Sequence, residues 1–153
     1  MQVQDVMSSP VLCCSTDATL DVAARLMWEG DCGVIPVVDK AGRLAGILTD
    51  RDICMACYTQ GKAPREIAVS SVMAEEVVTC RPDDSLEVVE RSLGQHQIRR
   101  APVVDDTSRP VGVVSLNTLA RHAATIDDGM DHGVVLTLAA IGEPRRSWPA
   151  QAE

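Results

Sequence analysis

Threonine, aspartate and arginine side chains gather in residues 46–52, where an apolar run gives way to a polar segment. These hydroxyl and carboxylate groups, together with the free N–H groups of a helix start, suit a ribose phosphate. Gly46 lets a ligand come close. The Asp52 carboxylate can accept hydrogen bonds from the 2′ and 3′ hydroxyls of a ribose, and Thr49 can donate to a phosphate or ribose oxygen. No nucleophile with a partner base accompanies them, so the stretch predicts binding and no catalytic residue.

Three arginines can supply positive charge for a phosphate, namely Arg51 and the adjacent Arg99 and Arg100. A guanidinium group binds phosphate through two parallel hydrogen bonds. The alternative is an ion pair with a surface carboxylate, which is the usual state of an exposed arginine. Phosphate contact is favoured for Arg99 and Arg100, because two adjacent charges precede an apolar strand, whereas both interpretations stay open for Arg51.

The composition limits the classes of partner. A net charge of −8 and an isoelectric point near 4.8 argue against nonspecific nucleic-acid binding, which depends on a basic surface. No apolar run approaches the ~20 residues of a membrane span, and the N-terminus lacks the order of a secretory signal. The sequence therefore predicts a cytoplasmic protein without nucleic-acid or membrane partners, whose six cysteines stay reduced.

An internal repeat organises the chain. A shift of 66 positions lays residues 3–53 over residues 69–119 without a gap, so that Pro36 falls on Pro102 and Gly46 on Gly112. Each unit reads as strand, helix, two buried strands and a closing helix, with apolar residues at helical or strand spacing. The expected strands cover residues 11–14, 34–38 and 44–48 in one unit and 77–80, 101–104 and 111–115 in the other. The closing helices are expected at residues 50–58 and 116–126.

The expected fold is α+β, with two β-α-β-β-α repeats related by a pseudo-twofold axis, their sheets packed together and the helices outside. The first repeat covers residues 1–58, a linker covers 59–67 and the second repeat covers 68–126. The strand connection in the first repeat places Gly42 in a tight turn, whereas residues 105–110 contain no glycine and predict a looser loop. Residues 127–153 have no repeat partner. Apolar residues from Val134 to Ile141 predict a short helix that covers a core edge or contacts a second subunit.

The motifs resemble those of a tandem CBS (cystathionine β-synthase) domain pair, also called a Bateman module. They are Val6-Met7, the apolar strand of residues 35–39, and residues 46–52, which are similar to the family signature G-h-x-[ST]-x-x-D. The resemblance covers residues 2–126. It implies a regulatory sensor, not an enzyme, that binds AMP, ADP, ATP or S-adenosylmethionine between its repeats, requires no cofactor, forms a homodimer and signals to an unidentified protein partner.

The same resemblance implies two clefts of unequal quality. The first holds the carboxylate signature and the arginine pair, with Val78 and Ile98 as aliphatic walls for an adenine; its residues are Gly46, Ile47, Thr49, Arg51, Asp52, Met73, Val78, Ile98, Arg99, Arg100 and Pro102. The second has a threonine where the family has aspartate and is expected to be empty, weak or filled by an uncharged ligand; its residues are Leu12, Cys32, Gly33, Pro36, Ser115 and Thr118.

Two other interpretations stay open. The spacing of Cys54 and Cys57 is found in zinc and redox sites, but no second ligand pair accompanies it, and small core residues explain it as well. No metal site is therefore predicted. The second interpretation is an interaction module with a vestigial pocket, whose role is dimerisation or docking.

Overall fold

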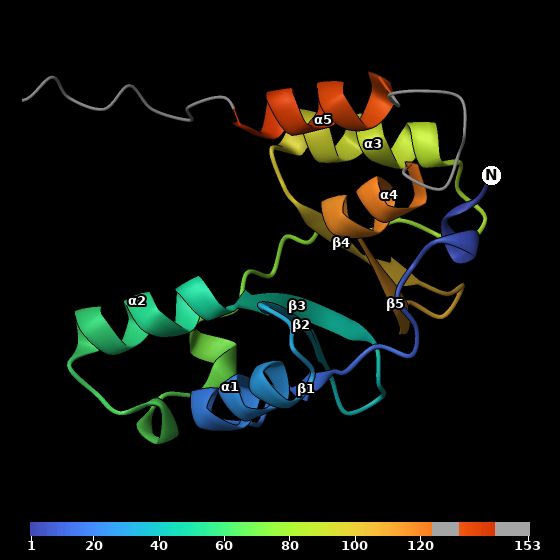
Figure 1. The fold of residues 1–153 in the computed structure, drawn as a ribbon. Coiled ribbons are helices and arrows are strands. Elements are labelled where there is room, and N and C mark those ends of the chain that lie inside the picture. The colour runs from blue at the N-terminus through green and yellow to red at the C-terminus, as the bar shows by residue number, and fades with distance from the viewer. Residues whose placement is uncertain (124–131, 143–153) are drawn as a thin grey trace, which may run out of the picture.

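The structure is a computed structural model that describes residues 1–123 and 132–142 (Figure 1). It contains the two expected repeats, each built on one antiparallel hairpin, and the expected α+β fold is confirmed. In the first repeat, β1 (Cys14–Ser15), β2 (Val34–Val38) and β3 (Leu44–Thr49) form a three-stranded sheet in the order β1-β2-β3. In the second repeat, β4 (Arg100–Val104) and β5 (Pro110–Ser115) form a two-stranded sheet.

The first strand of each repeat differs from the expectation. The strand expected at residues 11–14 is the two-residue β1, which pairs in parallel with β2. The strand expected at residues 77–80 is wrong, because only an isolated bridge joins Cys80 to Val103. The two hairpins nevertheless share one register, with an irregularity after Val37 in one and after Val103 in the other.

Five α-helices are described: α1 (Leu20–Glu29), α2 (Asp50–Gln60), α3 (Leu86–His96), α4 (Leu116–Ala123) and α5 (His132–Gly142). Helix α2 ends at Gly61, whose φ of +62° closes the helix without steric cost. The expected continuation of α4 to residue 126 lies outside the described residues. Helix α5 confirms the helix expected near the C-terminus and packs along α3 and against α4 (Figure 1).

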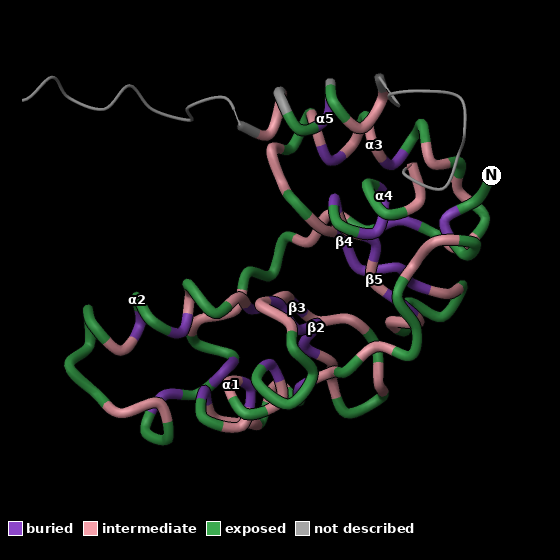
Figure 2. The backbone as a smooth tube through the Cα atoms, in the orientation of Figure 1, coloured by how far each residue is buried: buried purple, intermediate pink, exposed green. Residues whose placement is uncertain are grey.

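The repeats exchange their opening segments, which we define as residues 2–8 and 67–74. Val3 is fully buried in the core of the second repeat, with Leu93 and Val103. Ile67 and Val69 are buried in the core of the first repeat. Backbone hydrogen bonds hold the exchange, from the Leu20 N–H to the Ile67 carbonyl (3.0 Å) and from the Val3 N–H to the carbonyl of Asp84 (3.0 Å). Figure 2 shows the buried residues of both cores in purple. Each core is therefore completed by a segment that precedes the other repeat.

The turns of the two hairpins are alike, so the looser loop expected at residues 105–110 is wrong. An Asp105 carboxylate oxygen accepts the N–H groups of Thr107 (2.8 Å) and Arg109 (2.9 Å), as Asp39 does for Ala41 and Arg43. These hydrogen bonds lower the pKa of both aspartates, and the largest effect comes from the backbone N–H group of the arginine, Arg43 or Arg109. Ser108 takes the place of Gly42 and adopts the same left-handed backbone, with φ of +62° against +78°.

Replacing Ser108 by glycine is expected to stabilise the protein. Glycine adopts a positive φ without the steric cost that a β-carbon brings there, so the free energy of unfolding should rise by about 0.5–1 kcal/mol. Chemical denaturation of Ser108→Gly measures the change. The matched control is Gly42→Ser in the other hairpin, which should lower stability by a similar amount; an unchanged or lower stability of Ser108→Gly would contradict the argument.

Candidate functional site

Thr49 and Asp52 form a reciprocal cap at the start of α2. The Asp52 N–H donates to Thr49 Oγ1 (3.1 Å), while the Thr49 N–H (2.9 Å) and hydroxyl (2.7 Å) both donate to Asp52 Oδ2. The Thr49 hydroxyl is thus occupied by Asp52, which differs from its expected role as a donor to ligand. Asp52 Oδ1 accepts no hydrogen bond within the described part of the chain. The cap therefore orients a carboxylate that keeps one oxygen available.

The close approach at Gly46 is made by the chain itself. A β-carbon at this position would lie 2.7 Å from Met73 Sδ and 2.9 Å from the Ala74 carbonyl oxygen. The Ile47 N–H donates to that carbonyl, and the Ala74 N–H donates back to Ile47, both at 2.9 Å. Gly112 meets Met7 in the same way. The glycine admits the opening segment of the other repeat, so the explanation by ligand approach is not needed.

The strand register shows which of the remaining expected site residues share a hairpin. Val34 pairs with Thr49, and the Asp50 N–H donates to the Gly33 carbonyl (3.2 Å), so Cys32 and Gly33 lie beside the first signature. Arg100 pairs with Ser115, so the arginine pair lies on the hairpin of the second signature. The reason is that the start of one strand and the end of the next are register neighbours within one hairpin.

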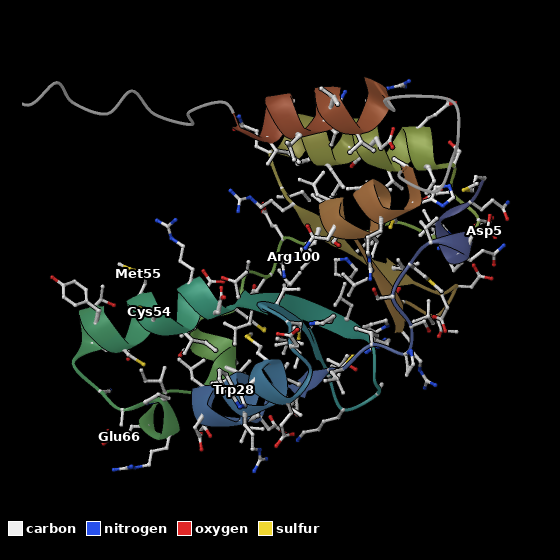
Figure 3. The ribbon with its side chains drawn as sticks, viewed as in Figure 1. Asp5, Trp28, Cys54, Met55, Glu66 and Arg100 are labelled. Carbon is white, nitrogen blue, oxygen red and sulfur yellow. The ribbon has the colours of Figure 1, made fainter. Side chains whose placement is uncertain are left out.

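The arginines expected at the phosphate make no ion pair with the part of the chain that the structure describes. Within the described residues, ion pairs join Lys40 to Asp17, Arg43 to Asp39 and Arg81 to Asp106. Arg51 and Arg99 are exposed and Arg100 is half-buried, and none of the three contacts a carboxylate there. Figure 3 shows Arg100 in the space between the two repeats. Among the described residues, three guanidinium groups without an ion pair are therefore available to an anion in a chain of net charge −8.

The second signature keeps the cap but has no free polar group at Thr118. The Ser115 N–H donates to Thr118 Oγ1 (2.8 Å), and the Thr118 hydroxyl donates to the Ser115 carbonyl (2.7 Å). Thr118 is only 5% exposed. Both functions of its hydroxyl are satisfied locally, so it cannot replace the carboxylate of the first signature as a ribose acceptor.

The other expected wall residues differ in exposure. Val78 and Ile98 are half-buried, and Leu12 is 44% exposed. Pro36 and Pro102 are buried, so they support the strands from within. Val78 and Ile98 therefore remain the candidates for contact with an adenine ring.

A pocket of about 590 Å³ that the sequence did not predict lies between α1 and α2. Its walls include Met27 and Trp28 from α1, Ile53 and Cys54 from α2, and Cys32 between the elements. Cys54 is exposed, so its explanation as a small core residue is wrong, whereas Cys57 is half-buried and packs against the first core as expected. Figure 3 labels Trp28 on α1 and Cys54 on α2. The exposure of the apolar side chains on these two helices is known only from the structure, so no residue pattern predicted the pocket.

The six cysteines are all free thiols in the structure. Burial raises the pKa of the Cys80 thiol to about 12, and burial also raises the pKa of Cys13 and Cys14. Within the described residues, no three His, Cys, Asp or Glu side chains lie close enough together to hold a metal ion. The described helices also include none that is long and apolar enough to span a membrane.

Both halves of the chain, residues 3–58 and 69–125, match the CBS domain family. The chain belongs to this family. The two matches coincide with the two repeats, each of which carries one hairpin and one capped signature. The expected tandem CBS pair is therefore confirmed.

Relatives of similar length support this assignment. The chain is 43% identical over 118 residues to the CBS domain-containing protein YhcV of Bacillus subtilis, covering 77% of this chain and 82% of that protein. It is 30% identical over 141 residues to Hypoxic response protein 1 of Mycobacterium tuberculosis, covering 92% and 94%. The matched region therefore makes up most of the length of each of these two proteins.

Solved structures have the same fold. The CBS domain pair of protein MJ0100, in complex with 5′-methylthioadenosine and S-adenosyl-L-methionine, has a TM-score of 0.73 and 26% identity and covers 82% of this chain and 97% of that one. Hypoxic Response Protein I, with two coordinated zinc ions, has a TM-score of 0.72 and 31% identity and covers 80% and 98%. The fold is thus found in a pair that binds adenosine derivatives and in one that binds zinc.

Proposed function

We propose that this CBS pair is a sensor that binds an adenosine-containing ligand between its two repeats. The observation that carries the proposal is the Asp52 carboxylate, which the cap with Thr49 holds in place with Oδ1 available. The complex of MJ0100 with two adenosine derivatives supports the ligand class. No residue of the site is assigned a catalytic role.

The ribose hydroxyls donate to Asp52 Oδ1, whose lone pairs accept both. A phosphate group of the ligand lies against Arg100, with Arg99 and Arg51 as further cations. The absence of ion pairs at these three arginines within the described residues supports this role, because an arginine already bound to a carboxylate has less to gain from a phosphate. Val78 and Ile98 supply aliphatic contact for the base.

The ligand regulates by population shift. A molecule bound between the repeats stabilises the arrangement in which both contact it, and a protein partner that recognises this arrangement then binds more tightly. We further propose that two copies of the chain form a dimer, so that the arrangement of the two repeats in one copy affects the surface of the dimer.

Replacing Arg100 by alanine is expected to weaken the binding of ligands that carry a phosphate but not of ligands that lack one. Affinity for AMP or ATP should fall about tenfold to a hundredfold, because a charge-assisted hydrogen bond contributes roughly 1.5–3 kcal/mol. Affinity for 5′-methylthioadenosine, which has no phosphate, should stay within about twofold. Calorimetry with AMP, ATP, 5′-methylthioadenosine and S-adenosylmethionine measures both.

The matched control is Arg91→Ala, an exposed arginine on α3 that makes no ion pair within the described residues. It should leave every affinity unchanged. An equal loss for phosphorylated and unphosphorylated ligands in Arg100→Ala contradicts the phosphate contact. Failure of all four ligands to bind the unchanged protein contradicts the proposed ligand class and favours an interaction module without a ligand.

A further inference from the structure

The pocket between α1 and α2, which we call the α1–α2 pocket, combines apolar walls with acidic charge. Its volume of about 590 Å³ lies in the range of roughly 300–1,000 Å³ that is usual for small-molecule sites. Met27 and Ile53 form part of its apolar lining. Among the described residues that line it, two are charged, Asp31 and Asp50, and both are acidic. A complementary ligand therefore has an apolar body and a positive charge.

A glycine makes room for the Asp50 carboxylate on one side of the pocket. A β-carbon at residue 33 would lie 2.8 Å from Asp50 Oδ2, so the carboxylate lies directly over the backbone of Gly33. Asp50 Oδ1 accepts the N–H of Arg51 (2.7 Å), whereas Oδ2 accepts no hydrogen bond from the described residues. Oδ2 is therefore available to a cation in the pocket.

The second repeat keeps the backbone of this corner without its charge. The Asp50 N–H donates to the Gly33 carbonyl (3.2 Å), and at the equivalent positions the Leu116 N–H donates to the Arg99 carbonyl (2.9 Å). Leucine and arginine thus stand where the first repeat has aspartate and glycine. Helix α5 packs on α3 and α4, the helices equivalent to α1 and α2. The acidic corner therefore belongs to the first repeat alone and is not needed to build a repeat.

Asp31 adds negative charge at the end of α1. The carbonyl groups at a helix C-terminus carry partial negative charge, which a nearby cation stabilises, and α1 has no basic residue in its last turn. Asp31 has a φ of +46°, and its N–H donates to the Trp28 carbonyl (3.3 Å), which fixes the backbone that carries the carboxylate. Neither Asp31 nor Asp50 forms an ion pair within the described residues. The negative charge of the pocket thus lacks a cation from that part of the chain.

An exposed indole lies beside these carboxylates. Trp28 lines the pocket and is 87% exposed, and Figure 3 labels it on α1. The face of a tryptophan ring attracts a cation more strongly than that of tyrosine or phenylalanine. The second repeat has Gly94 at this position. An indole, two carboxylates and apolar walls together suit an ammonium group attached to an apolar body.

We propose that the α1–α2 pocket binds an alkylammonium cation. The ammonium group contacts the carboxylates of Asp31 and Asp50 and the indole of Trp28, and the alkyl body packs on Met27 and Ile53. The adenosine ligand proposed above lies between the two repeats, so the cation has a site of its own. The inference depends neither on that ligand nor on self-association.

The fluorescence of Trp28 measures occupancy of the pocket. The chain has two tryptophans, so Trp148→Phe leaves Trp28 as its one indole and serves as the background for every variant. Titration with hexyltrimethylammonium should shift the emission to shorter wavelength, because the alkyl chain displaces water from the indole. Hexan-1-ol and hexanoate have a similar apolar body without the positive charge. They should bind at least tenfold more weakly, since they lose the two carboxylate contacts and the cation–π contact.

Replacing the two carboxylates tests their role. Asp31→Asn and Asp50→Asn are each expected to weaken hexyltrimethylammonium binding about twofold to fivefold, the range for exposed charge pairs, and the double variant about fivefold to twentyfold. The matched control is Glu75→Gln combined with Glu76→Gln, which removes two charges from exposed residues outside the pocket. Its affinity should stay within about twofold. Thermal melting shows whether each variant is folded.

Four results would overturn the proposal. The first two are an absence of any emission shift with hexyltrimethylammonium and an equal affinity for hexan-1-ol or hexanoate. The third is an equal loss in the control at Glu75 and Glu76, because binding then reflects only the net charge of −8. The fourth is a loss in Asp52→Asn as large as in the double variant, which would place the cation at the signature. The titration contains no nucleotide, so its failure leaves the adenosine proposal unaffected.

Discussion

Asp52→Asn is expected to weaken binding of an adenosine ligand about tenfold to a hundredfold while the protein stays folded. The amide oxygen can replace Oδ2 and accept the Thr49 N–H (2.9 Å in the carboxylate form), so the start of α2 is retained. The amide nitrogen then occupies the position of Oδ1 and cannot accept from a ribose hydroxyl. A hydrogen bond to a charged group contributes roughly 1.5–3 kcal/mol, which gives the expected factor.

The repeat provides a matched control for this variant. Thr118→Ala removes the equivalent side chain in the second signature, where the hydroxyl is buried and bonded to Ser115. It should lower the free energy of unfolding but leave ligand affinity unchanged. Calorimetry on both variants, with circular dichroism as a check on folding, decides the matter. An unchanged affinity in Asp52→Asn, or an equal loss in Thr118→Ala, would refute the assignment of the ribose to Asp52.

Ile67→Ala is expected to lower the free energy of unfolding by about 2–5 kcal/mol, a loss typical of isoleucine in a packed core. The side chain is 2% exposed and packs with the first core, although it falls at the end of the stretch expected to be a linker. Denaturant unfolding followed by circular dichroism measures the loss. Against a total stability of ~5–15 kcal/mol for a typical domain, the effect is large.

The control for Ile67 is Val88→Ala, an exposed valine whose replacement should change the stability by less than about 0.5 kcal/mol. A loss below 1 kcal/mol in Ile67→Ala would mean that the opening segment is not needed by the first core. Two separate unfolding transitions in the unchanged protein would mean the same, because cores joined by exchanged segments should unfold together.

Much of the fold could be predicted from the sequence because the same pattern occurs in both repeats, so that each repeat supports the assignment of the other. The spacing from Pro36 to Gly46 recurs from Pro102 to Gly112, and both hairpins are present with one register. The predictions were wrong where the two repeats differ in sequence. Ser108 replaces a glycine yet keeps its conformation, because the Asp105 carboxylate holds the turn through bonds that a search for glycine does not detect.

The site was predicted less completely, since its geometry depends on contacts between segments distant in sequence. The signature of Gly46 to Asp52 is present with its cap, but the contact between Gly46 and Met73 arises only from the exchange of opening segments. The placement of Arg100 beside Ser115 follows from strand register, which a residue pattern alone does not assign to one cleft or the other. The roles of Asp52 and the arginines in binding stay predictions.

The exchanged opening segments also determine the smallest part of this protein that contains complete cores. A gene fragment cut near residue 60 encodes Val3 without the core that it fills and leaves the first core without Ile67 and Val69. Neither fragment is a complete domain, so recombination, truncation or grafting of one repeat into another protein breaks two cores at once. We therefore expect the two CBS sequences to fold as one unit, so that a transplant of this architecture has to include both repeats.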